Sequence, residues 1–265
     1  MKKLQDKVTV ITGAGRGIGK SIALAFAEQG SDLALTARSL SQLEEVAREV
    51  KKLGRKAYPV PCDVSLPEEV QDLARNVKEE FGRVDILVNN AGISKRSKLL
   101  EYDDQVWLEV LKVNLFGTYL CSKMFLPMMQ KIGAGRIINI ASTAAKNPVP
   151  FNTSYSASKH GVLGLTKSLA SEVALTGYPE ITVNAICPFY VNTEMLTGPG
   201  GFVSTMMKIS GQSREEVLEK SVNRNLQRRA LDPEEIASLA LYLASDDGKG
   251  ITGQAINVCG GAAFH

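Results

Sequence analysis

Three residues that can move a proton lie near one another in the sequence. Tyr155 and Lys159 are four positions apart, and Ser142 lies thirteen positions upstream of Tyr155. Small helix-forming residues surround Tyr155, and in a helix residues i and i+4 share one face. A Lys ammonium beside a Tyr phenol favours the phenolate, which makes the Tyr a better proton donor and acceptor near neutral pH. A solvated helix face with an ordinary Tyr and Lys has the same spacing. The spacing alone therefore does not distinguish a catalytic pair from an ordinary helix surface, and motifs elsewhere in the chain are needed.

Short apolar runs alternate with helical patterns along the whole chain, and these elements would have to position the three residues. Strands are expected at 8–11, 33–37, 57–64, 84–92, 135–142, 181–188 and 253–261. Helices are expected at 17–30, 39–54, 67–82, about 104–131, around Tyr155 and at 233–245. The strands are apolar on both faces, as in a parallel sheet covered on both sides. The sequence predicts a single α/β domain over 1–265, a doubly wound parallel sheet (Rossmann fold) of about seven strands with helices on both faces.

The stretch 194–217 interrupts the alternation of strands and helices, because it is rich in Gly and Met. It is typical of an insertion over a pocket, and we expect a small substrate lid over about 194–225. An adaptable apolar cover would be formed by Met195, Leu196, Phe202, Met206 and Met207.

A glycine-rich turn follows the first expected strand and opens the first expected helix. It reads TGAGRGIG, with glycines at 13, 15, 17 and 19 in the spacing G-x-x-x-G-x-G. Glycines let the backbone turn tightly and approach a pyrophosphate, and free amides at the helix start can hold the anion. A turn without a ligand is the alternative, but the position between strand and helix favours a dinucleotide site.

Two arginines bear on the choice between NAD and NADP. An acidic residue at the end of the second strand binds the ribose 2′-hydroxyl of NAD, whereas a basic residue accommodates the 2′-phosphate of NADP. This chain has Arg38 there and no acid, and Arg16 lies within the glycine turn. Two guanidinium groups on one phosphate favour NADP(H) over NAD(H). The alternative is that both are ordinary surface arginines.

Composition narrows the class of protein. The chain has 265 residues, of which 44% are hydrophobic and 22% charged, and a net charge of +3, which is too small to indicate nucleic-acid binding. Four scattered cysteines and two histidines suggest neither a disulfide framework nor a metal site, so no metal is expected. There is no apolar run of about 18 residues and no secretory leader pattern, so we expect a cytoplasmic protein without a membrane span.

The order and spacing of five motifs resemble the short-chain dehydrogenase/reductase family. They are TGAGRGIG, NNAG at 89–92, YSASK at 155–159, Asn114 in KVNLFG and Ser142 in INIAS. The resemblance covers essentially the whole chain. It implies an oxidoreductase that transfers a hydride between a nicotinamide cofactor and a ketone or secondary alcohol.

The resemblance also implies the role of each residue. Tyr155 would be the general acid for ketone reduction, and Lys159 would lower its pKa and hold the nicotinamide ribose. Ser142 would bind the substrate carbonyl, and Asn114 would hold a water that links Lys159 to solvent. The cofactor would contact Gly13, Gly15, Arg16, Gly17, Ile18, Gly19, Arg38, Asp63, Val64, Asn90, Ala91, Gly92, Tyr155, Lys159, Pro188, Val191 and Thr193.

Within the family, the sequence is similar to bacterial β-ketoacyl reductases and especially to aromatic polyketide ketoreductases. It departs from the usual pattern at Phe189, which stands where the family has Gly and would either narrow the pocket or alter how the nicotinamide binds. The pocket is expected to include Ser94, Thr143, Phe189, Tyr190 and Met195. The substrate would be a small-molecule ketone, free or carried on coenzyme A or a carrier protein. Its pantetheine phosphates would meet Lys95, Arg96 and Lys98, unless these residues are simply a solvated loop.

Two other functions stay open. One is a catabolic NAD(P)-dependent dehydrogenase of a small hydroxy acid, cyclic alcohol or steroid. The other is a Rossmann-fold binding protein without catalysis, which the intact Ser142, Tyr155 and Lys159 disfavour. Apolar positions in 107–126 exceed one core-facing stripe, and with the family's habit of assembly they predict a homotetramer.

Overall fold

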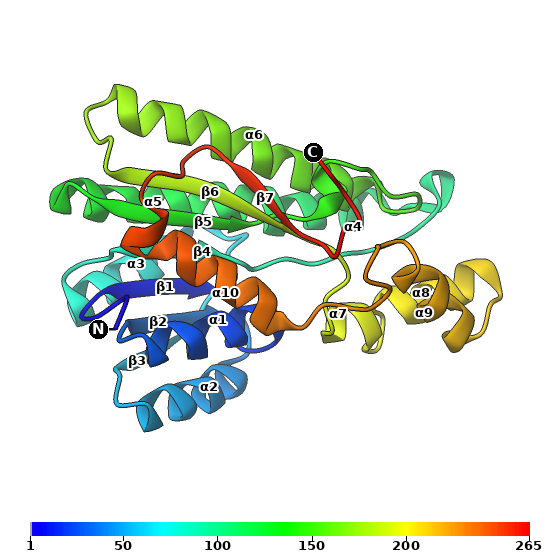
Figure 1. Cartoon of the computed structure of the whole chain (residues 1–265), viewed down its shortest axis with the longest axis horizontal. Helices are drawn as coiled ribbons and strands as arrows, with labels where there is room; N and C mark the ends of the chain where they lie inside the picture. The colour runs from blue at the N-terminus through cyan, green and yellow to red at the C-terminus, as the bar shows by residue number, and fades with distance from the viewer. Residues whose placement is uncertain (1) are drawn as a thin grey trace.

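The computed structural model describes residues 2–265 and contains a parallel sheet of seven strands, which confirms the predicted fold class (Figure 1). The strand order is β3-β2-β1-β4-β5-β6-β7. Because β1 lies between β2 and β4, the direction of winding reverses there, and crevices form beyond the carboxyl ends of strands at such a point. The strands are β1 (Val8–Thr12), β2 (Asp32–Ala37), β3 (Ala57–Pro61), β4 (Ile86–Asn89), β5 (Gly135–Ile140), β6 (Ile181–Pro188) and β7 (Ala255–Val258).

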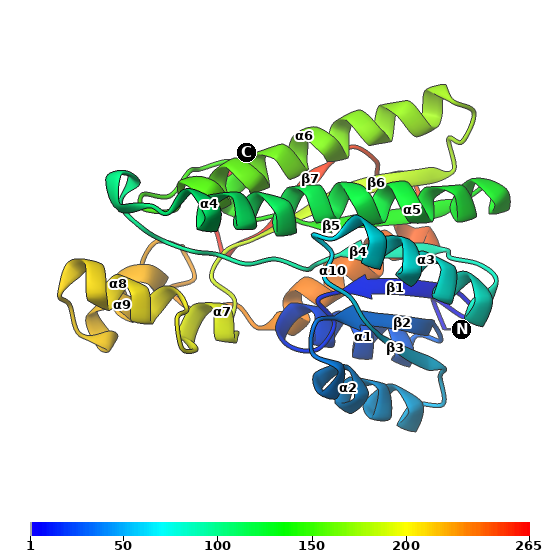
Figure 2. The same cartoon turned by 180° about the vertical axis from the view of Figure 1, so that it is seen from behind.

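Helices cover both faces of the sheet. Figure 1 shows one face with α1 (Gly17–Glu28), α2 (Leu40–Lys52) and α10 (Pro233–Ala244). Figure 2 shows the other face with α3 (Pro67–Phe81), α4 (Asp104–Leu111), α5 (Gly117–Ile132) and α6 (Thr153–Leu175).

Two apolar cores lie against the two faces of the sheet. Val10 and Ile11 are neighbours on β1, and both are 0% exposed because their side chains enter opposite cores. This is the physical reason for continuous apolar strands instead of alternating ones. Prolines 59 and 61 lie in β3, at the edge of the sheet, where a missing N–H costs least.

The helix expected over about 104–131 is confirmed and contains a π-helical turn that was not predicted. This turn, Lys112–Phe116, lies between α4 and α5, which follow one another without a gap, and it contains Asn114. Single π turns often occur at functional sites, since they redirect a side chain without ending the helix.

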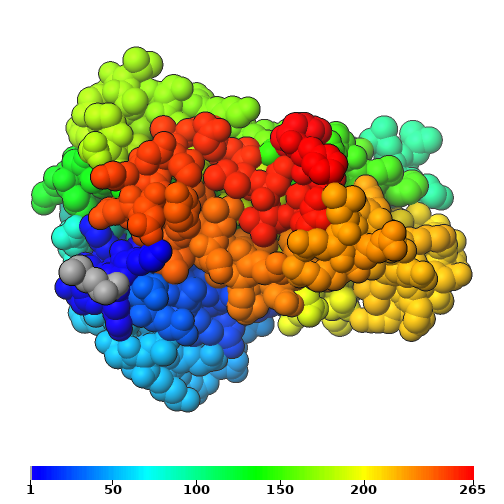
Figure 3. Space-filling view, viewed as in Figure 1, coloured from blue at the N-terminus to red at the C-terminus, as the bar shows by residue number. Residues whose placement is uncertain are grey.

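The predicted lid segment contains three short helices, α7 (Glu194–Thr197), α8 (Phe202–Ser210) and α9 (Arg214–Val222). They project beyond the carboxyl ends of the strands and have a small core of their own around Leu196, Val203 and Val217. Figure 3 shows the C-terminal residues lying against the chain that returns from the lid. The backbone N–H of Gln227 donates there to the carbonyl of Gly260 at 3.1 Å.

Candidate active site

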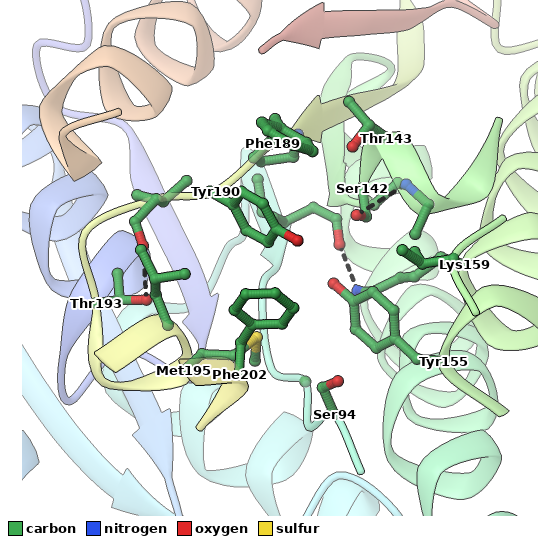
Figure 4. Close-up of a pocket in the computed structure, with 18 of the residues that line it drawn as sticks. Ser94, Ser142, Thr143, Tyr155, Lys159, Phe189, Tyr190, Thr193, Met195 and Phe202 are labelled. Atoms are coloured by element: carbon green, nitrogen blue, oxygen red, sulfur yellow. Dashed lines mark hydrogen bonds between the residues drawn. The ribbon is translucent and has the colours of Figure 1, made fainter. Parts of the chain in front are cut away.

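A cavity of about 220 Å³ lies between the sheet and the lid (Figure 4). The ends of β4, β5 and β6, the start of α6 and the lid contribute side chains to it. The structure brings together three of the four predicted catalytic residues here, Ser142, Tyr155 and Lys159. The predicted substrate residues Ser94, Thr143, Phe189, Tyr190 and Met195 line it, as do the predicted cofactor residues Ile18, Asn90, Gly92, Pro188, Val191 and Thr193.

Tyr155 lies in the first turn of α6, beside the residues that follow β5. Burial raises the pKa of its phenol, while a hydrogen bond with Ser142 and the charge of Arg96 lower it. The Ser142 oxygen accepts the backbone N–H of Ala144 at 3.1 Å, because Ser142 caps the short 3-10 turn Thr143–Ala145. That bond does not use the hydroxyl hydrogen of Ser142, which can therefore be donated to Tyr155 or to a carbonyl oxygen bound in the cavity. A protonated Tyr and a Ser donor that face one space can polarise and protonate a carbonyl oxygen.

Lys159 lies one helical turn after Tyr155 and is only 4% exposed. Its ammonium donates to the carbonyl of Ile140 at 2.7 Å and lies 5.7 Å from the centre of the Tyr155 ring. Burial lowers the pKa of Lys159 to about 8. The cation that lowers the pKa of Tyr155 in this structure is Arg96. The role of Lys159 in lowering the pKa of Tyr155 thus stays a prediction.

Asn114 is fully buried behind the cavity, and its carboxamide is held at both ends. Its Oδ1 accepts from the backbone of Ile93 at 2.8 Å, and its Nδ2 donates to the Ile93 carbonyl at 2.9 Å and to Ser158 at 3.0 Å. A Cβ on Gly92 would lie 3.4 Å from Asn114 Oδ1 and 3.6 Å from Lys159 Nζ. Asn114 and Lys159 therefore converge on the space that this glycine leaves free.

The glycine turn is held by the end of β4. Thr12 Oγ1 accepts from the backbone of Asn90 at 2.9 Å and of Ala91 at 3.0 Å, and Asn90 Nδ2 donates to the carbonyls of Thr12 and Gly13 at 2.9 and 3.0 Å. A Cβ at Gly19 would overlap the Gly13 carbonyl oxygen and lie 2.5 Å from Asn90 Nδ2. This explains why the sequence has glycine at that position.

The start of α1 fits a dinucleotide pyrophosphate. Its N-cap residue, Arg16, makes no side-chain capping bond, and the first turn holds no acidic residue. The N–H groups of that turn are therefore free to bind an anion, and the helix dipole favours one. Gly17 has φ +54°, and a Cβ there would lie 3.1 Å from Cγ2 of Thr193, so the turn also packs closely against the lid.

The remaining predicted cofactor residues lie away from the cavity lining. The Arg16 side chain forms an ion pair with Glu194 of α7, and Arg38 is exposed at the end of β2. Oδ1 of Asp63 accepts from Ser65, while Val64 is buried in a core. Gly13, Gly15 and Ala91 belong to the turn and to β4's end without lining the cavity.

Some predictions about the substrate end need correction. Met206 and Met207 were expected to cover the pocket, but they pack in the core of the lid itself. Lys95 and Lys98 are exposed, whereas Arg96 is half-buried and lines the cavity. Arg224 and Asn147 also line the cavity, and neither was predicted from the sequence. A pattern search has no signal for such residues, because loop contacts bring them there.

Within the described residues, no helix is long and apolar enough to cross a bilayer. Nor do residues 2–265 hold a group of three His, Cys, Asp or Glu side chains arranged for a metal ion.

Comparison with known proteins identifies relatives whose sequences and structures are similar to this chain over almost its whole length. The short chain dehydrogenase family matches residues 7–199. The chain is 38% identical over 263 residues to a "Putative ketoacyl reductase" of Streptomyces coelicolor, with 98% of each chain covered. It is 37% identical to a 3-oxoacyl-(acyl-carrier-protein) reductase of Staphylococcus epidermidis, over 97% of this chain and 98% of the relative. A crystal structure of an actinorhodin polyketide ketoreductase variant with NADPH superimposes with a TM-score of 0.92 at 37% identity, covering both chains fully. The chain therefore belongs to the short-chain dehydrogenase family, whose members are oxidoreductases.

Proposed function

We propose that this protein is an NADPH-dependent reductase of a ketone in a β-ketoacyl or polyketide-like substrate. The observation that carries the proposal is the meeting of Ser142, Tyr155 and Lys159 in one cavity beside the glycine turn. The reductase names of the similar proteins support the direction of the reaction and the substrate class.

In the proposed reaction, the reduced nicotinamide supplies a hydride to the carbonyl carbon when it is bound. The Ser142 hydroxyl donates a hydrogen bond to the carbonyl oxygen and stabilises its developing negative charge. The Tyr155 hydroxyl gives its proton to that oxygen, which completes the alcohol. Burial keeps Tyr155 protonated at neutral pH by raising its pKa, as an acid in this step requires. Lys159 and Asn114, which converge beside Gly92, would return a proton to Tyr155 from solvent.

The proposed preference for NADPH rests on Arg38 and Arg16. Arg38 is exposed with no carboxylate within 4 Å among residues 2–265, so it is free to bind a 2′-phosphate. Arg16 must break its ion pair with Glu194 before it can bind the same 2′-phosphate as Arg38. An Arg38→Asp variant should lower the ratio of kcat/KM for NADPH to that for NADH by about 100-fold. A matched Arg75→Asp variant on the exposed face of α3 should leave the ratio unchanged.

The first test measures oxidation of NADPH and NADH at neutral pH with acetoacetyl-CoA and with a simple cyclic ketone. Turnover with NADPH and a higher rate for the thioester would support the proposal. Turnover mainly with NADH would instead favour a catabolic dehydrogenase of a hydroxy acid or cyclic alcohol. Binding of both cofactors without reduction of any ketone would favour a binding protein.

We further propose that residues 1–265 act as one catalytic unit within a cytoplasmic homotetramer. Leu108, Phe116 and Tyr119 are exposed on α4, the π turn and α5, and Phe116 stacks on Tyr119 at 6.0 Å. Burial of this apolar face between copies would remove it from water. Light scattering that gives a monomer mass would contradict the tetramer. A carrier protein as substrate donor would be tested by comparing carrier-bound with CoA-bound acetoacetate.

A further inference from the structure

Three aromatic rings, tilted against one another, and two guanidinium groups lie in a row along the lid side of the cavity. Tyr190 lies between Phe189 and Phe202, with ring centres 4.2 and 4.7 Å apart. Arg96 lies over the Phe202 ring at 4.6 Å, and Arg224 lies 6.0 Å from the Phe189 ring. Figure 4 shows the Tyr190 and Phe202 rings across the cavity from Ser142 and Tyr155. Stacking orients each guanidinium without neutralising its charge.

The side chains that line the cavity include positively charged groups but no negatively charged ones. The lining includes the half-buried Arg96, the buried Lys159 and the exposed Arg224, but no Asp or Glu. Within residues 2–265, no carboxylate lies within 4 Å of Arg96 or Arg224, whereas Arg16 nearby is paired with Glu194. Buried charges are normally paired, so a guanidinium held inside a cavity without a carboxylate is typical of a site for an anion.

Arg96 is held by a neutral partner that leaves its charge available. The buried carboxamide of Asn152, oriented with its oxygen toward Ser94 and Arg96, accepts from Arg96 Nη2 at 3.3 Å and donates to the Lys95 carbonyl at 3.0 Å. Tyr102 fixes the same loop by donating to the Lys95 carbonyl at 2.6 Å. Burial lowers the pKa of Arg96, and the repulsion from Arg224, which lines the same cavity, lowers it further. A bound anion would relieve that repulsion.

The position of Arg96 restricts where the anion lies on a substrate. Arg96 and Tyr155 line the same cavity of about 220 Å³, so a substrate that fills it can contact the guanidinium and the proton donor at once. A pantetheine phosphate is separated from the ketone by the whole pantetheine chain. A carboxylate a few bonds from the ketone has the required separation.

We propose that Arg96, supported by Arg224, forms a subsite for a carboxylate, so that this reductase prefers ketones carrying a carboxylate near the carbonyl over uncharged ketones of the same size. The expected preference in kcat/KM rests on the proposed function, because it can be measured only if the protein reduces ketones. It concerns substrate choice at the same site, with Arg96 binding the carboxylate while Ser142 and Tyr155 bind the carbonyl oxygen.

The kinetic test compares acetoacetate, 4-oxopentanoate and 5-oxohexanoate with their methyl esters. At least one acid should have a kcat/KM about tenfold or more above that of its ester. Arg96→Met, which keeps an apolar stem over Phe202, should bring the ratio of kcat/KM for the acid to that for its ester down to about one. The ratio is the readout because Arg96 also lowers the pKa of Tyr155, so its loss changes the rate with both substrates. Arg96→Lys should restore part of the preference, because it returns the charge without the planar fork. Lys208→Met, which removes an exposed cation from α8, is the matched control and should keep the full preference.

The source of the anion is tested with two thioesters. Acetoacetyl-CoA carries phosphates, and acetoacetyl-N-acetylcysteamine carries none. If Arg96→Met lowers the rate only with acetoacetyl-CoA and leaves the acids unaffected, Arg96 binds phosphate and the carboxylate assignment is overturned. Equal losses with acids and esters would also overturn it, because Arg96 would then only shape the cavity.

A binding measurement separates this inference from the proposed function. The tertiary alcohol 3-hydroxy-3-methylbutanoate has no carbinol hydrogen and cannot be oxidised. Calorimetry in the presence of NADP⁺ should show that it binds the wild type, that its methyl ester binds about tenfold more weakly, and that Arg96→Met removes the difference. This result would support the carboxylate subsite even if no ketone were reduced. Equal binding of acid and ester to the wild type would overturn it, whatever the reductase assay gives.

Discussion

At the glycine-turn end of the cavity the chain presents mainly backbone groups, whereas at the lid end it presents side chains from segments far apart. The turn is fixed by Thr12 and Asn90, which join the ends of β1 and β4 through short hydrogen bonds. The lid end combines Arg96 from a loop, Tyr190 from beyond β6 and Phe202 from α8. The first end can therefore bind the same cofactor in many relatives, while the second can change with each substrate.

The two ends also differ in how they are supported. The strands that carry the turn are buried between two large cores. The lid has only the small cluster around Leu196, Val203 and Val217. Segments with little buried apolar area open at lower cost than the main core. We therefore expect changes near the sheet to affect chemistry and stability, and changes in the lid to affect substrate affinity.

The largest effect is expected at Tyr155, where the two ends meet. Tyr155→Phe should lower kcat by about 10³-fold, because it removes the proton donor and keeps the ring. NADPH binding and Tm should change little. Stopped-flow and calorimetric measurements would check this. The control is Tyr178→Phe, a partly buried Tyr packed against the core, which should keep its activity. Retained activity in Tyr155→Phe would mean that another group supplies the proton.

A smaller effect, a loss of NADPH affinity, is expected when the glycine turn after β1 is altered. Gly19→Ala should weaken NADPH binding about 100-fold, since its Cβ would overlap the Gly13 carbonyl and force the turn to move. Gly164→Ala is the matched control, because nothing lies within 4 Å of its Cβ and it is in α6. That variant should raise the free energy of unfolding by about 0.5–1 kcal/mol. Equal NADPH affinity in the two variants would contradict the close approach at Gly19.

The glycine-turn end and the lid end of the cavity also differ in how much of their structure can be predicted from the sequence. The elements were predictable because local signals fix them, such as Pro67 at the start of α3 and Gly82, in a left-handed conformation, at its end. Tyr155 and Lys159 were recognisable because their spacing is one helical turn.

The remaining features depend on contacts that no local pattern encodes. The π turn holds Asn114, whose carboxamide bonds residues 21 and 44 positions away in the chain. Arg96 enters the cavity because Phe202 and Asn152 contact it. From sequence alone, a charged residue in a loop is predicted to be exposed to solvent, because the distant contacts that bury it are not visible in the sequence.

Removing the buried cation should separate stability from chemistry. Burial lowers the pKa of Lys159 from 10.5 to about 8, so the charged form is disfavoured in the folded chain. This costs about 3 kcal/mol at pH 7. Lys159→Met removes that cost and loses the bond to Ile140, worth about 1 kcal/mol, so a net gain of about 2 kcal/mol in the free energy of unfolding is expected. Its kcat should fall, but by less than that of Tyr155→Phe, because the proton donor itself is retained.

The pH dependence of that gain has a defined sign. Between pH 8 and 10.5 the unfolded chain holds a proton on Lys159 that the folded chain has released, so wild-type stability rises with pH there. The gain of Lys159→Met should therefore be constant below pH 8, fall to zero near pH 10 and become a loss of about 1 kcal/mol above pH 10.5, where only the lost bond to Ile140 remains. Urea unfolding at several pH values would measure it. A gain that grows with pH would contradict the buried charge.

The smallest effect is expected in the lid and tests its independence from the main core. Val203 in α8 is 0% exposed, and Val203→Ala removes about 2 kcal/mol of packing from the lid cluster. We expect the lid to open without unfolding the sheet, so Tm should stay nearly unchanged while KM for the ketone rises about three- to tenfold. Val77→Ala makes the same deletion in the large core beneath α3 and should do the reverse, lowering Tm by a few degrees with KM unchanged. If both variants lowered Tm equally, the lid would unfold together with the sheet, and its adaptation to substrate could not be separated from the stability of the fold.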